Sequence, residues 1–271
     1  MNFIDRTWSA FVDEVKTQII QDRRFIYRGH ANSAWKLRTS LHRTGQWKTP
    51  EDIASYITQI VPLAHESVAA WEGVKRNLAD PFEMAQFLAY LQHNGFPTPL
   101  LDWTYSPYIA GFFAFEGINH YEPEYDHISI YCFDKELWLR SYTQSYDYND
   151  KNLHVSILEP SCVGNPKLML QQGLFMYTNL DDIEGHIEHN QQGKPEPFLR
   201  KYRIHCREQA LALRELRLMN ITRMQLFPSV ESVCRKVATD VSLLFPMGKT
   251  RSEITNEQLA RLLAGYKTGQ K

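Results

Sequence analysis

The residues best suited to chemistry gather in one largely apolar stretch, "LQHNGFPTPLLDWTYSPYIAGFFAF", at residues 91–115. Its Asp102 stands between Leu and Trp, and a carboxylate in such surroundings needs a partner because an unpaired buried charge is costly. Arg28 or Arg43 could supply that partner. The stretch also contains the groups that a site could use for acid–base chemistry and hydrogen bonding, on His93, Asp102, Thr104 and Ser106.

The same stretch predicts a strand, "LLDWT", that gives way to a helix. Ser106 is a suitable N-cap and Pro107 a suitable first helical residue. The free N–H groups at the start of such a helix suit an anionic ligand. For Ser106 taken alone, the capping role is the favoured interpretation.

A second candidate is "FIYRGH", where Arg28 ends an apolar strand and Gly29 allows a sharp turn. The guanidinium presents five donors in a planar fork, which suits a phosphate or a ribose edge. A buried salt bridge is an equally weighted structural role for Arg28.

A third candidate is "LMLQQGLFMYT", which we predict to be a strand. Gln171 and Gln172 interrupt its apolar pattern directly before Gly173. An amide at the functional end of a strand could hold a ligand hydroxyl, or the two amides could simply point to solvent. Their spacing does not decide between these alternatives.

Other common chemistries lack a sequence signature. There is no P-loop, dinucleotide-binding glycine motif or nucleophile elbow, the 10 His show no metal-ligand spacing, and the 4 Cys are far apart. We therefore expect no metal site. Six basic residues within residues 200–217 could contact phosphate, although a solvated surface is the favoured interpretation; they are Arg200, Lys201, Arg203, Arg207, Arg214 and Arg217.

The elements that must position these residues follow from hydrophobic periodicity and turn signals. We predict helices over 7–20, over 50–94 with breaks at Pro62 and at 80–83, and over 207–220 and 228–245. We predict strands over 23–29, 100–104, 127–133, 153–160, 166–178 and 198–205, a short strand at 35–37, and polar loops or a tail over 141–152, 179–197 and 247–271.

The chain as a whole has the composition of a globular protein. It has 271 residues, 43% hydrophobic and 23% charged residues, and a formal net charge of −1. The N-terminus lacks a signal-peptide pattern and no stretch is apolar enough to span a bilayer. We expect a cytoplasmic protein with no membrane partner, and an α+β fold in a single domain with a helical N-terminal half.

These motifs together resemble the FRG domain family. The resemblance rests on "YRG" at 27–29, "AWKLRTSLHR" at 34–43, the stretch 91–114, "QQGLF" at 171–175 and "LRLMNITRMQLFPSVESV" at 216–233. It implies an N-terminal helix at 1–23, an FRG domain at 24–245 and a C-terminal tail at 246–271.

A more distant resemblance is to ADP-ribosyltransferases, in which an Arg-Gly strand, a Ser-Thr-Ser-like strand and a Glu-bearing strand follow in that order. The resemblance implies a split β-sheet core that uses NAD as a substrate, without a metal. Arg28 would bind the phosphate and ribose of NAD, Thr104 and Ser106 would orient the nicotinamide ribose, and Gln171 would take the place of the Glu. Further residues of this implied cofactor site are Tyr27, Gly29, His93, Trp103 and Tyr108, whose aromatic members could stack on nicotinamide.

Gln171 cannot stabilise a developing cation as a carboxylate can. Asp102, Glu159 or Glu231 could supply the missing charge, or the activity could be absent. The resemblance implies an ADP-ribosyltransferase acting on nucleic acid, with RNA slightly favoured, or on protein, as a bacterial toxin or phage-defence effector with an antitoxin partner. The alternatives are a catalytically inactive nucleotide- or NAD-metabolite-binding module and a protein-interaction domain.

Overall fold

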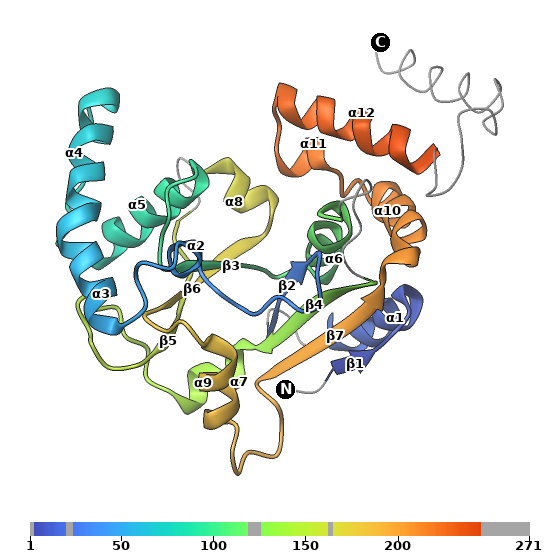
Figure 1. Cartoon of the computed structure of the whole chain (residues 1–271), viewed down its shortest axis with the longest axis horizontal. Helices are drawn as coiled ribbons and strands as arrows, with labels where there is room; N and C mark the ends of the chain where they lie inside the picture. The colour runs from blue at the N-terminus through green and yellow to red at the C-terminus, as the bar shows by residue number, and fades with distance from the viewer. Residues whose placement is uncertain (1–2, 20–23, 119–125, 162–164, 245–271) are drawn as a thin grey trace.

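A computed structural model describes residues 3–19, 24–118, 126–161 and 165–244, and it contains one seven-stranded sheet (Figure 1). The strand order is β1-β7-β4-β2-β3-β6-β5, and all neighbours are antiparallel except the parallel pair β1–β7. The strands are β1 (Phe3–Asp5), β2 (Phe25–His30), β3 (Leu100–Thr104), β4 (His127–Asp134), β5 (Val155–Leu158), β6 (Gly173–Thr178) and β7 (Leu199–His205). The predicted mixed α and β class is confirmed.

The helices confirm most of the predicted elements. Ser106 caps one helix and Pro107 follows it, as the sequence predicts, and the predicted break at 80–83 is the start of a helix that Asp80 caps. The longer helices are α1 (Trp8–Ile19), α4 (Val61–Glu72), α5 (Pro81–His93), α6 (Pro107–Glu116), α9 (Ile183–Asn190), α10 (Gln209–Leu218) and α12 (Val230–Leu244). The shorter ones are α2 (Ser40–Arg43), α3 (Pro50–Ser55), the π-helical turn η1 (Tyr56–Ile60), α7 (Lys135–Ser141), α8 (Pro166–Leu170), the 3-10 turn η2 (Cys206–Glu208) and α11 (Arg223–Leu226).

The predicted strand over residues 166–178 is wrong in its first half. Asn165 accepts a hydrogen bond from the Leu168 N–H and starts α8, with Pro166 in its first turn, so the chain begins as a helix. The strand begins only at Gly173, after Gln172 adopts a left-handed φ of 48°. Gln171 therefore lies at the end of a helix and not within a strand.

Two further predictions need correction, and a third is not tested. Residues 35–37 form no strand among the described residues, because Leu37 donates its N–H to the Glu184 side chain instead of a neighbouring strand. Helix α9 occupies part of the predicted loop 179–197, since Asp182 caps it. The prediction for the tail over 246–271 lies outside the described residues.

The two faces of the sheet are covered differently, and this difference creates the cleft. One face carries a single core that includes Ile26, Trp103 and Tyr131. The other face carries two separate cores, one around α1, α6 and α10 over β2, β4 and β7, and one around α3 to α5 over β3 and β6. Figure 1 shows these two groups as separate sides of the molecule, with α4 and α5 on one and α10 to α12 on the other.

The two groups meet where the sheet is joined most weakly. Strands β2 and β3 share a single paired position, Tyr27 with Thr104, whereas β2 and β4 pair over six positions from Phe25 to His30. From this pair towards Arg28 on β2 and Asp102 on β3 the two strands separate, so backbone groups on this edge need other partners. The sheet is continuous, but this junction divides it into a four-stranded and a three-stranded part.

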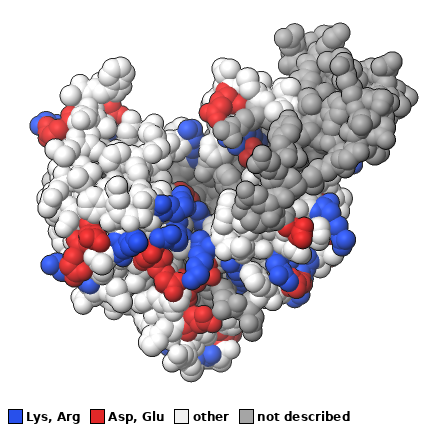
Figure 2. Space-filling view, in the orientation of Figure 1, with Lys and Arg blue, Asp and Glu red and all other residues white. Residues whose placement is uncertain are grey.

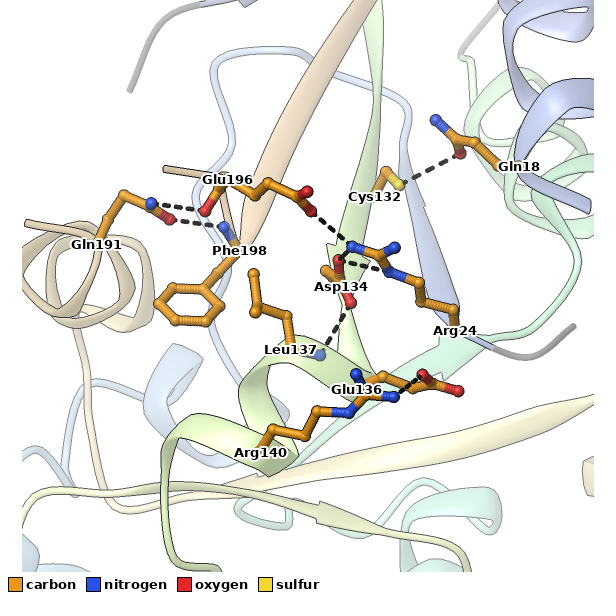
Figure 3. A network of polar contacts seen from close by, with 10 residues as sticks. All are labelled: Gln18, Arg24, Cys132, Asp134, Glu136, Leu137, Arg140, Gln191, Glu196 and Phe198. Atoms are coloured by element: carbon orange, nitrogen blue, oxygen red, sulfur yellow. Dashed lines mark hydrogen bonds and ion pairs between the residues drawn. The ribbon is translucent and has the colours of Figure 1, made fainter. Parts of the chain in front are cut away.

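A polar network fixes the far end of β4 (Figure 3). Asp134 is fully buried and accepts two hydrogen bonds from Arg24, at 2.8 Å and 2.5 Å, while its other oxygen accepts the Leu137 N–H that starts α7. Arg24 also contacts Glu196 at 2.7 Å. The network joins β4 to the start of α7 and to the segment before β7. Among the described residues, no helix is long and apolar enough to cross a membrane.

Candidate functional site

A cleft of about 380 Å³ lies at the junction of β2 and β3, between the two helical groups. Its floor includes Arg28, Asp102 and Thr104. One wall comes from the end of α5 and from α8, and the other from α6 and the residue after α11. The lining residues on these walls are Ala89, Gln92, His93, Asn165, Lys167, Leu168 and Gln171 on the first, and Phe113 and Phe227 on the second.

Arg28 fills the gap between the separating strands. Its Nη1 donates to the main-chain carbonyl of Asp102 at 2.6 Å, and its Nε donates to His30 Nε2 at 3.0 Å. The guanidinium thus takes the place of a strand as the partner of the Asp102 backbone. No described residue accepts from Arg28 Nη2, which leaves this nitrogen free to bind a ligand in the cleft.

His30 holds the Arg28 guanidinium in place as a neutral ring. Burial, with the nearby charges of Arg28 and Lys201, keeps the pKa of His30 well below its usual value. Its Nε2 therefore remains an acceptor at neutral pH. Burial also lowers the pKa of Arg28 and the Asp102 carboxylate opposes that shift; a guanidinium stays charged at neutral pH in either case.

Asp102 is not buried as the sequence predicts, because its side chain is 61% exposed and points into the cleft. The predicted partner Arg28 is confirmed, with Nη1 3.6 Å from Asp102 Oδ2. Gln92 donates to Asp102 Oδ1 at 2.7 Å and so fixes the carboxylate on the other side. Asp102 is the one carboxylate among the described residues that line the cleft.

Gly29 is required by packing and not by a turn. A Cβ at this position would lie 1.9 Å from the main-chain oxygen of Ala110 in α6. Only glycine lets α6 approach β2 this closely. The "RG" pair therefore combines a charged group for the cleft with close contact to the helix behind it.

Thr104 and Ser106 are occupied by structural bonds. The Thr104 hydroxyl donates to the Gln171 carbonyl at 2.7 Å and accepts the Ser106 N–H at 3.0 Å. Ser106 accepts the Ile109 N–H at 3.2 Å as the cap of α6 and is not among the lining residues. Its capping role is confirmed, and the prediction that Ser106 lines the cleft is wrong.

Gln171 lies in the same cleft as Arg28, as predicted, although it reaches the cleft from the end of α8. Its Nε2 donates to the Leu226 carbonyl at 3.3 Å, which connects α8 to α11. The alternative carboxylates lie elsewhere. Glu159 bonds Lys135 at 2.8 Å, and Glu231 is 67% exposed and 4.0 Å from Arg223.

The other titratable groups of the cleft lie on its α5 and α8 wall. His93 lines the cleft as predicted, and partial burial together with the Lys167 charge lowers its pKa. This lowered pKa favours the neutral His93 ring, which can accept a hydrogen bond in the cleft. Lys167, which the sequence analysis did not single out, adds a second cation to this wall.

The aromatic rings that face the cleft differ from the predicted ones. Tyr27 and Trp103 line it, but both are buried, with the Tyr27 hydroxyl bonded to Gln18 at 2.8 Å and the Trp103 ring 5.9 Å from Phe133 on the opposite face of the sheet. Tyr108 packs against the α6 core and is not among the lining residues. Two other rings, Phe113 and Phe227, line the cleft in an edge-to-face pair 5.8 Å apart. Phe227 falls within the 216–233 motif, so the sequence contained a signal for it.

The site thus combines a cation, a carboxylate and a polar amide on one side with two phenyl rings on the other. It could bind an anionic ligand that carries a flat ring. No group of three or more His, Cys, Asp or Glu side chains in the described part of the chain could hold a metal ion.

A second cavity of about 540 Å³ is larger but chemically less suited to a ligand. It is lined by Arg24, Glu136, Leu137, Arg140, Lys194, Pro195 and Glu196. Arg140 is paired with Glu136 at 2.9 Å and Arg24 with Glu196 (Figure 3). These charges already neutralise one another, so we assign the site to the smaller cleft.

Comparison with known proteins agrees with the first motifs of the sequence. No curated protein and no solved structure matches the chain. A family model matches one segment of the chain, residues 23–122. This segment contains Arg28, Gly29 and Asp102, whereas Gln171 and Phe227 come from later parts of the chain. Residues 23–122 match the model of the FRG domain, and this match supports the resemblance to the FRG family for that segment of the chain.

Proposed function

We propose that this chain is an ADP-ribosyltransferase-like enzyme that cleaves NAD in the cleft at the junction of β2 and β3. The observation that carries the proposal is the placement of Arg28, Asp102, His93 and Gln171 around one cavity. Its volume of about 380 Å³ falls in the range of roughly 300–1,000 Å³ that is usual for small-molecule sites.

The chemistry of NAD fits these groups. The Arg28 Nη2 edge would bind a phosphate oxygen, since guanidinium–phosphate contacts are strong and directional. Phe113 and Phe227 would contact a flat ring. Gln171 and Gln92 carry amides that could hydrogen-bond ribose hydroxyls.

The transfer step requires a negative charge near the ribose. The bond between nicotinamide N1 and ribose C1′ breaks, and its electron pair leaves with nicotinamide. An acceptor lone pair then bonds C1′, and the acceptor proton passes to a base. We assign Asp102 to both tasks, because a carboxylate can stabilise the developing cation and take the proton.

A second candidate function is binding without turnover. The hydroxyls of Thr104 and Ser106 are already used in structural bonds, and an amide occupies position 171. These features favour a nucleotide-binding module if Asp102 does not act on the ribose. The role as a toxin or phage-defence effector, with an antitoxin partner, stays a prediction of the resemblance.

The experiment is to incubate the purified chain with NAD labelled in the adenylate portion, together with cell lysate, and to follow label in protein and nucleic acid. Wild type should transfer label, and Arg28→Ala should not. Arg140→Ala, which removes an exposed arginine from the other cavity, should behave as wild type. Calorimetry with NAD separates the candidates, because binding without transfer would support the module and refute the enzyme.

A further inference from the structure

A basic segment lies beside the cleft and has no role in the proposed reaction. It is the 34–43 segment, Ala34 to Arg43, which runs from the core on one face of the sheet at Leu37 to the α3–α5 core at Leu41. Figure 2 shows Lys and Arg side chains gathered beside the central hollow, between the α4 side and the α12 side of the molecule.

Two cations of the 34–43 segment, Lys36 and Arg43, are exposed, whereas Arg38 is paired with Asp181. Arg43 is exposed, and its Nη1 donates a hydrogen bond to the Arg38 carbonyl at 3.0 Å. Its positive charge contributes to lowering the pKa of Arg28. The Lys36 side chain is 66% exposed, and its Nζ lies 3.7 Å from Asp182 Oδ1. Such an exposed ion pair contributes little free energy. Lys167 lines the cleft and Arg43 lies near enough to Arg28 to act on its charge, so positive charge is present both in the cleft and beside it.

Trp35 adds an aromatic surface to these cations. Trp35 is 49% exposed. Its backbone is held in place, because its carbonyl accepts hydrogen bonds from the Tyr131 hydroxyl and from Lys201 Nζ. The ring lies 6.2 Å from His30, the partner of Arg28. Cations alternating with an exposed ring are the usual means of holding single-stranded nucleic acid, where phosphates pair with the cations and bases stack.

The strand part of the basic run at 200–217, which lies in β7, does not provide such a surface, whereas Arg207, Arg214 and Arg217 of the same run are exposed. Lys201 is buried, Arg203 is bonded to Asp5 at 2.6 Å, and Arg200 lies over the Phe25 ring. The prediction that the whole run is a solvated surface is therefore wrong for its strand part, where Lys201 is buried and Arg203 is paired with Asp5.

We propose that the 34–43 segment binds single-stranded nucleic acid and presents one unpaired nucleotide to the cleft as the acceptor. This rests on the proposed function for the transfer step, but binding itself does not require NAD. An unpaired strand is required because the floor of the cleft is recessed and a base within a duplex cannot reach it.

The test measures fluorescence polarisation of labelled 12-nucleotide RNA and DNA, single-stranded and duplex, with the full chain in 50 mM NaCl. Wild type should bind a single strand more tightly than the matching duplex. Lys36→Glu with Arg43→Glu should weaken binding about tenfold or more and lower the salt slope by about 1.4, since each lost single-strand contact removes about 0.7. Trp35→Ala should weaken it roughly fivefold or more through lost stacking.

The matched control is Lys75→Glu with Arg140→Glu, which changes the net charge equally at exposed positions elsewhere and should keep affinity within twofold. Equal losses in both double variants, tighter duplex binding, or no binding by wild type would each overturn the proposal. NAD affinity of Trp35→Ala is measured in parallel and should be unchanged. Loss of nucleic-acid binding with intact NAD turnover then separates this inference from the proposed function.

Discussion

The Arg28 guanidinium donates to the Asp102 main-chain carbonyl at 2.6 Å, across the gap where β2 and β3 separate. The Arg28 side chain thus supplies a hydrogen bond to β3 on the edge from which β2 has separated. The same guanidinium lies 3.6 Å from the Asp102 carboxylate and on the floor of the cleft. Arg28 therefore has two roles: it stabilises the junction of β2 and β3, and it presents a cation to the cleft.

Arg28→Lys should weaken both NAD binding and the stability of the fold. A single ammonium keeps the charge but cannot reach His30 Nε2 and the Asp102 carbonyl together. We expect NAD binding to weaken at least tenfold, since hydrogen bonds to charged groups contribute about 1.5–3 kcal/mol, and the free energy of unfolding to fall by about 1–3 kcal/mol. Calorimetry and urea unfolding measure these changes, with Arg140→Lys as control. An NAD affinity within twofold of wild type would remove Arg28 from the site.

Gly29→Ala should destabilise the fold strongly. The added methyl would lie 1.9 Å from the Ala110 oxygen, and α6 would have to move away from β2. We expect the free energy of unfolding to fall by about 3 kcal/mol, the upper end of overpacking effects. Gly45→Ala is the control, because nothing lies near its Cβ and only the left-handed φ of 77° is strained, worth about 1 kcal/mol. Equal losses in the two variants, measured by urea unfolding, would refute the close contact.

Gln171→Glu should not create a better enzyme, although it restores the residue type that the resemblance implies. The new carboxylate would face the Leu226 carbonyl, which accepts from the amide at 3.3 Å. We expect a loss of about 1–2 kcal/mol in stability and no increase in nicotinamide release. Exposed Gln172→Glu is the control. A tenfold increase in release by Gln171→Glu would show that position 171, and not Asp102, is the functional place for the carboxylate.

Stability should fall in weak acid because of His42. This ring is buried and bonded to Thr39 at 2.6 Å, and burial lowers its pKa to about 4. The unfolded chain, with a His pKa near 6.5, binds the proton first, so the contribution is complete above about pH 6.5 and is lost as the pH falls towards 4.

Between pH 7 and pH 5 the His42 contribution should decrease by about 2 kcal/mol. Urea unfolding of wild type and His42→Gln at both pH values isolates it, because His30 adds a change in the same direction in both proteins. An identical pH dependence in the two proteins would mean that His42 is protonated without penalty in the fold.

The sequence predicts the elements that depend on local signals. The cap at Ser106 and the break at 80–83 each follow from neighbouring residues, and the structure contains both, the second as the start of α5 after Asp80. The strand at 166–170 was wrong because apolar "LML" is ambiguous between helix and strand, and the cap at Asn165 decided it.

The site was predictable only in part, for a topological reason. Arg28 and Asp102 stand within motifs, and pairing between them follows from charge. The exposure of Asp102 depends on the separation of β2 from β3, and the contact between Phe113 and Phe227 joins residues far apart in the chain. Neither has a local sequence pattern.

The most direct test of the account is nicotinamide release from NAD by the purified chain, compared with Asp102→Asn. The substitution keeps an acceptor for Gln92 and removes the charge, and the side chain is 61% exposed, so the variant should fold. Wild type should release nicotinamide, and Asp102→Asn should do so about a hundredfold more slowly while binding NAD within threefold. Equal rates in the two proteins, or no release by folded wild type, would contradict the assignment of the cleft as an NAD-cleaving site.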